Sequence, residues 1–438
     1  MANINRREFI KLNAAAPLGL ALTVAGNSPA RSESNVKSVR VGLVGTGNRG
    51  RSLLSTMLKI DGVKVPALCD INIENLTAAR NIVVEAGQAR PEGYSKNEYA
   101  FQQLMDRDDL NAVIIATPWN WHTQMAVYGM KARKYVGVEV PAAFTLAECW
   151  DLVNTHQQTQ VPCMMLENWS FRRDNLAVLN IIRKALFGEI VHCHCAHSHD
   201  CIDHWFFDAK TGKDLWPAQY LLKHNRDLYP THQLGPVISW MNIGCGDYFD
   251  YITSTATGCF GINDYFIRKF GPDHPNAKRK YSQGDIVTTV VRTKKGKSIV
   301  INYDMQLPRP YDNRWMIQGT RGIYNEQRDS ICITGKGSGY HEWQPFAPYQ
   351  QKYEHTWWKT AKGQSGGHGG TDYLELYLFL NAVRNRTQTP LDIYDSVIMC
   401  VTGPLSEQSI AAGGAPVPVP DFTGGKWKTK KPTFALET

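Results

Sequence analysis

Tyr229 and His232 are the side chains whose spacing most directly suggests proton transfer. Only Pro230 and Thr231 separate them, so a phenol and an imidazole three residues apart would face one site if the segment is a helical turn. Both groups can exchange protons with a bound substrate. The alternative for His232 is a structural role, as a capping or core histidine.

His368 lies in a segment of unusual composition, with two glycines on each side of it in residues 366–370. So much glycine costs backbone entropy, which the presentation of one imidazole in a mobile or tightly wound loop would justify. A disordered linker is the alternative. Further upstream, Pro308 and Pro310 make a rigid turn before Tyr311, which is either a substrate contact or an aromatic edge of a sheet.

A glycine-rich turn indicates a nucleotide site. The sequence GTGNRG at residues 45–50 follows a buried-strand pattern and opens a helical one, and Asp70 ends the next strand, twenty residues beyond Gly50. The glycines let the backbone approach a pyrophosphate at the helix N-terminus. Asp70 would bind both ribose hydroxyls and repel a 2′-phosphate, so the turn predicts NAD rather than NADP. A glycine turn without a ligand is the alternative.

The elements that must position these groups fall into two kinds. Strands expected at 39–44, 63–69, 111–116 and 135–141 alternate with helical stretches, which specifies a parallel, doubly wound Rossmann sheet in an α/β fold. From about residue 189, strands at 190–196, 286–292, 298–303 and 315–319 are joined by long polar loops, and a helix covers 371–384. This part predicts an α+β domain with an open, mostly antiparallel sheet.

The predicted domain boundaries follow from these patterns. We expect the NAD-binding domain at 38–165, the substrate and catalytic domain at 166–425, whose final helices can return to the Rossmann domain, and a basic tail at 426–438. Lysines 426, 428, 430 and 431 dominate that tail in a chain of net charge +8. We interpret it as a solvated tail, because no nucleic-acid motif accompanies it.

The N-terminus has the pattern of an export signal. Arg6 and Arg7 precede a weakly apolar stretch at 12–24 and a small-residue cleavage site at 28–30. This predicts a twin-arginine (Tat) signal at 1–31 and a periplasmic location, with a frayed helix as the alternative. The apolar stretch is too short to span a bilayer. The ten cysteines form no CxxC pair, which favours buried free thiols in a protein folded before export.

Residues 192–200 contain four histidines and two cysteines, a composition that suggests a metal site. On a strand, however, alternate side chains point to opposite faces, so these groups divide into two sets without the loop spacing of zinc sites. The sequence therefore predicts no metal. His199 is expected at a strand end bordering the substrate cleft.

Several motifs together carry a family resemblance. Thr117-Pro118 with His122 nearby, and Glu139-Val140-Pro141 in place of a Glu-Lys-Pro motif, resemble the Gfo/Idh/MocA oxidoreductases. More closely, the chain is similar to glycoside hydrolase family 109, the NAD-dependent α-N-acetylgalactosaminidases, through the segments GTGNRG, EVPAA, MMLEN, LYPTH, PRPY and GGHGGTDY. Valine cannot transfer a proton as the dehydrogenase lysine does, so Val140 implies either an inactive protein or acid–base work done by other residues.

The resemblance assigns roles to the candidate residues. It implies that His232 and Tyr229 exchange protons with the sugar, that His368 is the acid or base at the glycosidic oxygen, and that Tyr311 contacts substrate, to which we add Glu139 and His199. The residues expected to hold NAD are Gly45, Thr46, Gly47, Asn48, Arg49, Gly50, Asp70, Thr117, Trp119, His122, Glu139 and Asn168.

The implied reaction is hydrolysis without net oxidation. Hydride leaves the sugar C3 for NAD⁺, a base removes the C2 proton, the aglycone leaves C1, water adds, and the hydride returns to C3. Because NAD is regenerated in place, this mechanism suits an exported enzyme acting on a small-molecule or glycan substrate. The chain has phenylalanine and leucine, Phe171 and Leu221, where the family tends to polar residues, so we expect a changed sugar preference.

Two other functions stay open. The chain could be an exported sugar oxidoreductase with tightly bound NAD(P), or a non-catalytic carbohydrate-binding relative. As partners we expect neither nucleic acid nor membrane insertion, and by analogy a homo-oligomer formed through the open sheet of the second domain.

Overall fold

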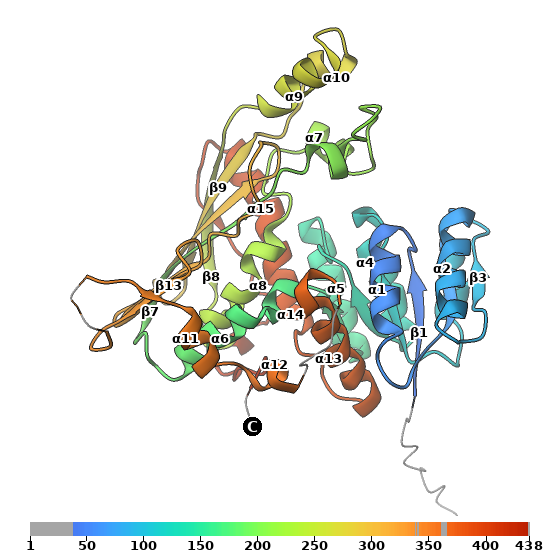
Figure 1. Ribbon diagram of the computed structural model, residues 1–438, viewed down its shortest axis with the longest axis horizontal. Coiled ribbons are helices and arrows are strands. Elements are labelled where there is room, and N and C mark those ends of the chain that lie inside the picture. The colour runs from blue at the N-terminus through green and yellow to red at the C-terminus, as the bar shows by residue number, and fades with distance from the viewer. Residues whose placement is uncertain (1–37, 338, 340, 361–365, 437–438) are drawn as a thin grey trace, which may run out of the picture. The chain divides into compact units, whose positions relative to one another are not determined.

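The first half of the chain forms a parallel sheet covered by helices. The computed structural model describes residues 38–337, 339, 341–360 and 366–436 (Figure 1), so the predicted export signal lies outside the described residues. The six strands are ordered β3-β2-β1-β4-β5-β6, and every neighbouring pair is parallel. They are β1 (Val39–Val44), β2 (Val63–Cys69), β3 (Glu92–Tyr94), β4 (Ala112–Ile115), β5 (Tyr135–Val138) and β6 (Cys163–Met165).

Apolar strands form this sheet because helices cover both of its faces. All four residues of β4 are buried, as expected where crossover helices shield the two sides of a strand. The helices are α1 (Asn48–Met57), α2 (Ile73–Glu85), α3 (Ala100–Met105), α4 (Trp119–Lys131) and α5 (Leu146–Thr159). The predicted Rossmann sheet is confirmed. The strand expected at 135–141 ends at Val138, so Glu139 and Val140 lie in the loop beyond its carboxyl end.

The second sheet has nine strands in the order β14-β13-β12-β11-β7-β10-β9-β8-β15, and only the pair β7–β10 is parallel. The expected open, mostly antiparallel sheet is therefore confirmed. Its strands are β7 (Ile190–Ser198), β8 (Phe249–Ala256), β9 (Ile286–Thr293), β10 (Ser298–Asp304), β11 (Met316–Gly319), β12 (Gly322–Asn325), β13 (Ser330–Ile333), β14 (Gln344–Pro345) and β15 (Val417–Pro418).

Helices connect the two sheets. Helix α8 packs against β7 and β10, α13 packs against α1, and α14 packs against both α5 and α8 (Figure 1). The described helices after β6 are η1 (Asn168–Phe171), α6 (Arg173–Arg183), the π-helix η2 (Ile202–Phe206), α7 (Ala218–Lys223), α8 (Pro230–Trp240), α9 (Gly261–Phe270), α10 (Pro275–Lys278), α11 (Ala347–Lys352), α12 (Thr356–Thr360), η3 (His368–Gly370), α13 (Thr371–Asn385), α14 (Ile393–Cys400), α15 (Thr402–Ala411) and η4 (Lys426–Lys428).

The predicted free thiols are confirmed: all ten cysteines are unpaired and seven are buried. The basic segment differs from a solvated tail at two positions. Trp427 stacks on Tyr248 with ring centroids 6.0 Å apart, and Lys430 forms an ion pair with Asp392. None of the described helices combines the length and apolarity needed to cross a bilayer.

One face of the second sheet carries a polar ladder. His194 Nε2 lies 2.8 Å from Asn302 Oδ1, and Asn302 Nδ2 donates to Thr288 Oγ1 at 2.9 Å. Val290 beside them is 39% exposed. Association of a second copy through this sheet stays a prediction.

Candidate functional site

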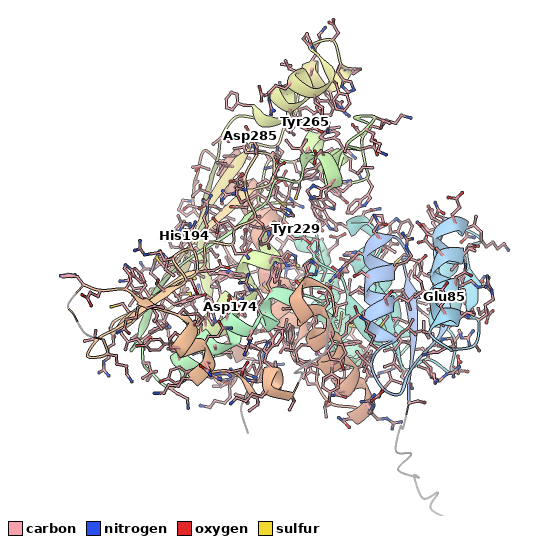
Figure 2. The ribbon with its side chains drawn as sticks, in the orientation of Figure 1. Glu85, Asp174, His194, Tyr229, Tyr265 and Asp285 are labelled. Atoms are coloured by element: carbon pink, nitrogen blue, oxygen red, sulfur yellow. The ribbon has the colours of Figure 1, made fainter. Side chains whose placement is uncertain are left out.

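A pocket of about 650 Å³ lies at the carboxyl edge of the parallel sheet. Because parallel strands end at the same edge, the turn after β1, the end of β2, the β4–α4 loop and the loop after β5 all contribute to it. The predicted cofactor residues that line it are Gly45, Gly47, Asn48, Arg49, Asp70, Thr117, Trp119, His122 and Glu139. Tyr229 also lines it, and Figure 2 shows this residue between His194 of β7 and Glu85 of α2.

The three glycines of the first turn fit a dinucleotide. Gly45 has a φ of +85°, and a Cβ there would lie 2.5 Å from the backbone oxygen of Ala116. A Cβ on Gly50 would lie 1.9 Å from the backbone oxygen of Gly45, so α1 can approach β1 only through glycine. A Cβ on Gly47 would meet no protein atom within 4 Å, which leaves its backbone open to the pocket. A tight turn, close helix packing and an open approach are what a pyrophosphate requires.

Asp70 is held in place by the same turn. Its Oδ2 accepts hydrogen bonds from the backbone N–H of Thr46 at 2.7 Å and from Thr46 Oγ1 at 3.0 Å. Its Oδ1 accepts from the backbone N–H of Asn72 at 2.8 Å. Asp70 stays partly exposed to the pocket, where its charge suits two ribose hydroxyls and opposes a 2′-phosphate.

Arg49 connects the pocket to α13. Its Nε donates to Glu139 Oε1 at 2.6 Å and its Nη1 to Asp372 Oδ2 at 2.6 Å. Asn168 does not line the pocket, and its Nδ2 instead donates to Asp372 Oδ1 at 2.7 Å. Glu139 and Arg49 therefore line the pocket as an ion pair. Asn168 does not touch this pair but binds Asp372, which in turn binds Arg49.

His122 serves the pocket as a structural link. Its ring nitrogens lie 2.7 Å from the backbone oxygen of Thr117 and 2.8 Å from that of Pro141, so it ties together the two loops that carry Thr117 and Val140. Burial lowers the pKa of its imidazole. The ring lines the pocket, and each of its nitrogens lies against a backbone oxygen, to one of which the single N–H of the neutral ring donates.

A cluster of aromatic side chains also lines the pocket. Trp119 lies with its ring centroid 5.3 Å from that of Trp205, 5.5 Å from that of Trp216 and 5.8 Å from that of Tyr229. Trp205 and Trp216 follow β7 and also line the pocket. Sequence reasoning missed this contribution because nothing in the loop at 202–217 indicates that it folds over the nucleotide site.

His232 is paired with a buried carboxylate. Its Nδ1 lies 2.7 Å from Glu167 Oε1, and Ser170 Oγ donates to Glu167 Oε2 at 2.6 Å. A Cβ on Gly235 would lie 1.9 Å from Glu167 Oε2, so only glycine on this turn of α8 admits the carboxylate. Sequence reasoning missed this role of Glu167. The available signal was its position two residues beyond β6, at the edge where the other strands place their functional groups.

Tyr229 precedes α8, and Pro230 begins the helix. The ring centroids of Tyr229 and His232 lie 5.0 Å apart, so the expected pairing on one helical turn is present. Burial, followed by the nearby Glu139 carboxylate, raises the pKa of the Tyr229 phenol well above 10. The phenol is therefore neutral near pH 7 and can donate a proton or a hydrogen bond.

The other predicted substrate residues gather around His197 and Trp169. His197 lies with its ring centroid 5.3 Å from that of His232 and 5.6 Å from that of Tyr311, and Tyr311 lies 4.9 Å from His199. Burial holds the pKa of His197 well below 6.5, so its imidazole is neutral. Tyr311 is 40% exposed, as a substrate contact requires.

His368 joins this group through Trp169. The ring centroid of Trp169 lies 5.4 Å from that of His368 and 5.8 Å from that of His232. His368 has a left-handed φ of +53°, its side chain is 46% exposed, and its Nδ1 lies 3.0 Å from Asp372 Oδ2. Although burial opposes it, the hydrogen bond from His368 and the charge of Arg49 lower the pKa of Asp372. The glycine-rich loop therefore places the imidazole of His368 in contact with the ionised carboxylate of Asp372.

Two departures from the family pattern lie away from the cleft. Phe171 is fully buried with its ring centroid 5.3 Å from that of Phe434, and Leu221 is fully buried in an apolar cluster. Neither side chain therefore offers a direct contact to a sugar, and the expected change in sugar preference stays a prediction.

Two family models match successive parts of the chain. Residues 39–167 match the oxidoreductase family with an NAD-binding Rossmann fold, and residues 171–429 match the C-terminal domain of glycosyl hydrolase 109. The chain is 38% identical over 465 aligned residues to the alpha-N-acetylgalactosaminidase of Tannerella forsythia, covering 98% of this chain and 99% of that one. It is 39% identical over 460 residues to a glycosyl hydrolase family 109 protein of Shewanella pealeana, covering 99% and 100%.

Solved structures share the fold at low sequence identity. Levoglucosan dehydrogenase in complex with NADH and L-sorbose has a TM-score of 0.67 and 18% identity, covering 88% of this chain and 100% of that one. An NAD binding oxidoreductase from Klebsiella pneumoniae has a TM-score of 0.69 and 16% identity, with the same coverage.

Proposed function

The chain belongs to glycosyl hydrolase family 109 and uses NAD as its cofactor, and we propose that it hydrolyses N-acetylhexosaminides such as α-N-acetylgalactosaminides by NAD-dependent chemistry. The sugar is proposed because the relative from Tannerella forsythia is named an alpha-N-acetylgalactosaminidase. We propose further that the enzyme acts outside the cytoplasm, after export directed by residues 1–31.

One observation supports this proposal above the others. Val140 lines the nucleotide pocket and has no proton to exchange, whereas Tyr229 lines the same pocket and adjoins the His232–Glu167 pair. Proton-transferring groups therefore stand beside the place where NAD would present its reactive ring, but Tyr229 and His232 come from the start of α8 and not from the loop after β5.

Each of these side chains has a distinct task. NAD, when bound, supplies a reversible hydride acceptor. Glu167 fixes the ring of His232 through Nδ1, which leaves Nε2 to move a proton at a sugar carbon or hydroxyl. The neutral Tyr229 phenol donates toward a sugar oxygen.

His368 is assigned to the glycosidic oxygen. Asp372 Oδ2 lies 3.0 Å from its Nδ1 and orients the ring, which leaves Nε2 as the atom that can move a proton at the glycosidic oxygen. The partial exposure of His368 leaves room for a leaving group that extends into solvent.

A redox cycle that ends where it began needs no cofactor exchange. The pocket suits retention, because Trp205 and Trp216 add two large rings to its lining and pack against Trp119. This property would allow an enzyme to work in a compartment without free NAD.

The test uses purified protein with no added cofactor. We expect denaturation to release about one NAD per chain, and p-nitrophenyl glycosides of N-acetylhexosamines to release nitrophenol with solvent deuterium incorporated at C2. Nitrophenol release without deuterium would overturn the mechanism. A spectral change of bound cofactor on adding free sugar, with no glycoside cleaved, would instead identify a sugar oxidoreductase.

A further inference from the structure

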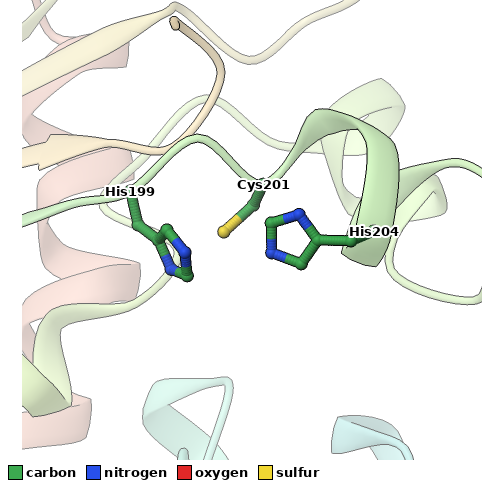
Figure 3. Close-up of side chains that lie close together, drawn as sticks. All are labelled: His199, Cys201 and His204. Atoms are coloured by element: carbon green, nitrogen blue, oxygen red, sulfur yellow. The ribbon is translucent and has the colours of Figure 1, made fainter. Parts of the chain in front are cut away.

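Three nitrogen and sulfur ligands converge just beyond the end of β7. The side chains of His199, Cys201 and His204 each offer one donor atom, and these atoms all lie within 4.8 Å of one another. Figure 3 shows both rings directed toward the space beside the Cys201 sulfur. Within the part of the chain that the structure describes, no other three histidine, cysteine or acidic side chains meet in this way.

The backbone that carries these residues is anchored to the second sheet. The N–H of His199 donates to the backbone oxygen of Asp304 at 2.8 Å, and that of Cys201 donates to Met305 at 3.2 Å. The π-helix η2 follows at once, with the N–H of Phe206 donating to the oxygen of Cys201 at 3.2 Å. His204 therefore lies on a hydrogen-bonded turn that returns it toward Cys201. Single π-turns of this kind often mark functional positions.

We propose that His199, Cys201 and His204 form a binding site for Zn²⁺. Two imidazoles and a thiolate are the ligands that this ion prefers, whereas Ca²⁺ and Mg²⁺ require oxygen. Zinc bonds of about 2.0 Å to nitrogen and about 2.3 Å to sulfur need only a modest closing of the cluster. His204 is exposed and can make that movement by rotating its side chain.

The position of the cluster links it to the cleft. His204 lines the nucleotide pocket, and the ring centroid of His199 lies 4.9 Å from that of Tyr311. Three protein ligands leave a fourth coordination position, which a water or a substrate oxygen would occupy. The ion would therefore stand at the substrate end of the site, separate from the His232–Glu167 pair.

The ion pair that would compete with zinc for His204 is weak. His204 Nδ1 lies 3.6 Å from Asp203 Oδ1, with the two side chains 50% and 47% exposed, and exposed pairs of this kind contribute little. The sequence predicts no metal because strand alternation separates the ligands of residues 192–200. Strand alternation does not apply to Cys201 and His204, because both residues lie beyond the end of β7.

The test titrates the purified full-length protein with Co²⁺, a spectroscopic substitute for Zn²⁺. We expect one equivalent to produce a near-ultraviolet thiolate-to-cobalt band with visible bands of tetrahedral Co²⁺, and Zn²⁺ to displace it. Cys201→Ser should abolish the thiolate band and weaken Zn²⁺ binding about 100-fold or more, since even outer-shell changes cost 10–100-fold. Cys259→Ser, at a partly buried thiol outside the cluster, is the control and should behave as the wild type.

His204→Gln gives a second, independent reading if Cys201→Ser fails to fold, and it should also weaken Zn²⁺ binding. Wild-type protein that shows no thiolate band at one equivalent would overturn the proposal. So would an undiminished band in folded Cys201→Ser. Copurifying NAD and nitrophenol release are measured on the same samples without metal, so failure of the metal site and failure of the proposed glycosidase are separately visible.

Discussion

Glu167 and His232 are 65 positions apart in the chain, yet Glu167 Oε1 lies 2.7 Å from His232 Nδ1. The carboxylate follows the last strand of the parallel sheet and is fully buried, whereas the imidazole is on α8 beside the second sheet. A carboxylate on Nδ1 sets the tautomer and the direction of the ring, so that Nε2 is the atom left for chemistry. The site is thus assembled across the two sheets.

Replacing Glu167 by glutamine tests this arrangement. Glu167→Gln should lower kcat for glycoside hydrolysis about 100-fold or more, because the ring of His232 loses the charge that orients it. Copurifying NAD should remain at the wild-type level. Glu407→Gln is the matched control, since Glu407 Oε1 lies 3.0 Å from His224 Nδ1 away from the nucleotide pocket. Equal losses in the two variants would contradict the positioning role.

Gly50, in the first turn of α1, and Gly47, just before α1, should respond differently to replacement by alanine. Gly50→Ala forces a Cβ to within 1.9 Å of the Gly45 oxygen, so we expect a stability loss of about 1–3 kcal/mol by chemical denaturation. Gly47→Ala meets no protein atom within 4 Å and should keep its stability while losing most of its copurifying NAD. NAD retained at full level in Gly47→Ala would mean that the pyrophosphate lies elsewhere.

The leaving group should reveal the role of His368. If this imidazole protonates the glycosidic oxygen, His368→Ala should lose about 100-fold in kcat on unactivated glycosides but much less on p-nitrophenyl glycosides, whose leaving group needs no proton. His194→Ala is the control, because its imidazole is bound to Asn302 on the second sheet. An identical loss on both substrate types would remove His368 from the acid role.

Local patterns predicted the parts of the site that lie on single elements. The turn at 45–50, Asp70, and the Tyr229–His232 pair are each defined by a strand or helix and its immediate flank, and each lies where expected. The partner of His232 could not be predicted, because that contact depends on how two sheets pack. The packing of Phe171 against Phe434 could not be predicted either, because it also depends on tertiary structure.

The predicted export signal at residues 1–31 lies outside the residues that the structure describes. With Arg6 and Arg7 both replaced by lysine, we expect the precursor to accumulate in the cytoplasm in its folded, NAD-containing form. The wild type should appear in the periplasm with its cofactor, because the Tat route moves folded proteins. Fractionation and immunoblotting of the two strains measure this. Equal periplasmic levels would contradict Tat export.

Asp227, two residues before Tyr229, should make folding stability depend on pH. Burial raises the pKa of its carboxyl from 3.8 to about 7, and its contacts are the Tyr229 N–H, at 3.1 Å from Oδ1, and the Gln233 amide. Below pH 3.8 both the folded and the unfolded chain hold the proton, and the stabilisation by protonated Asp227 is complete. Between pH 3.8 and about 7 only the folded chain holds it, so stability must fall as pH rises.

Asp227→Asn removes that titration and keeps an amide oxygen for the Tyr229 N–H. The slope of unfolding free energy against pH between about 4.5 and 6.5 should become less negative by as much as about 1.4 kcal/mol per pH unit. Urea denaturation at several pH values in this window measures both slopes. Parallel profiles for wild type and variant would show that Asp227 is already ionised in the folded protein, and that the start of α8 is held by a charged carboxylate instead of a neutral one.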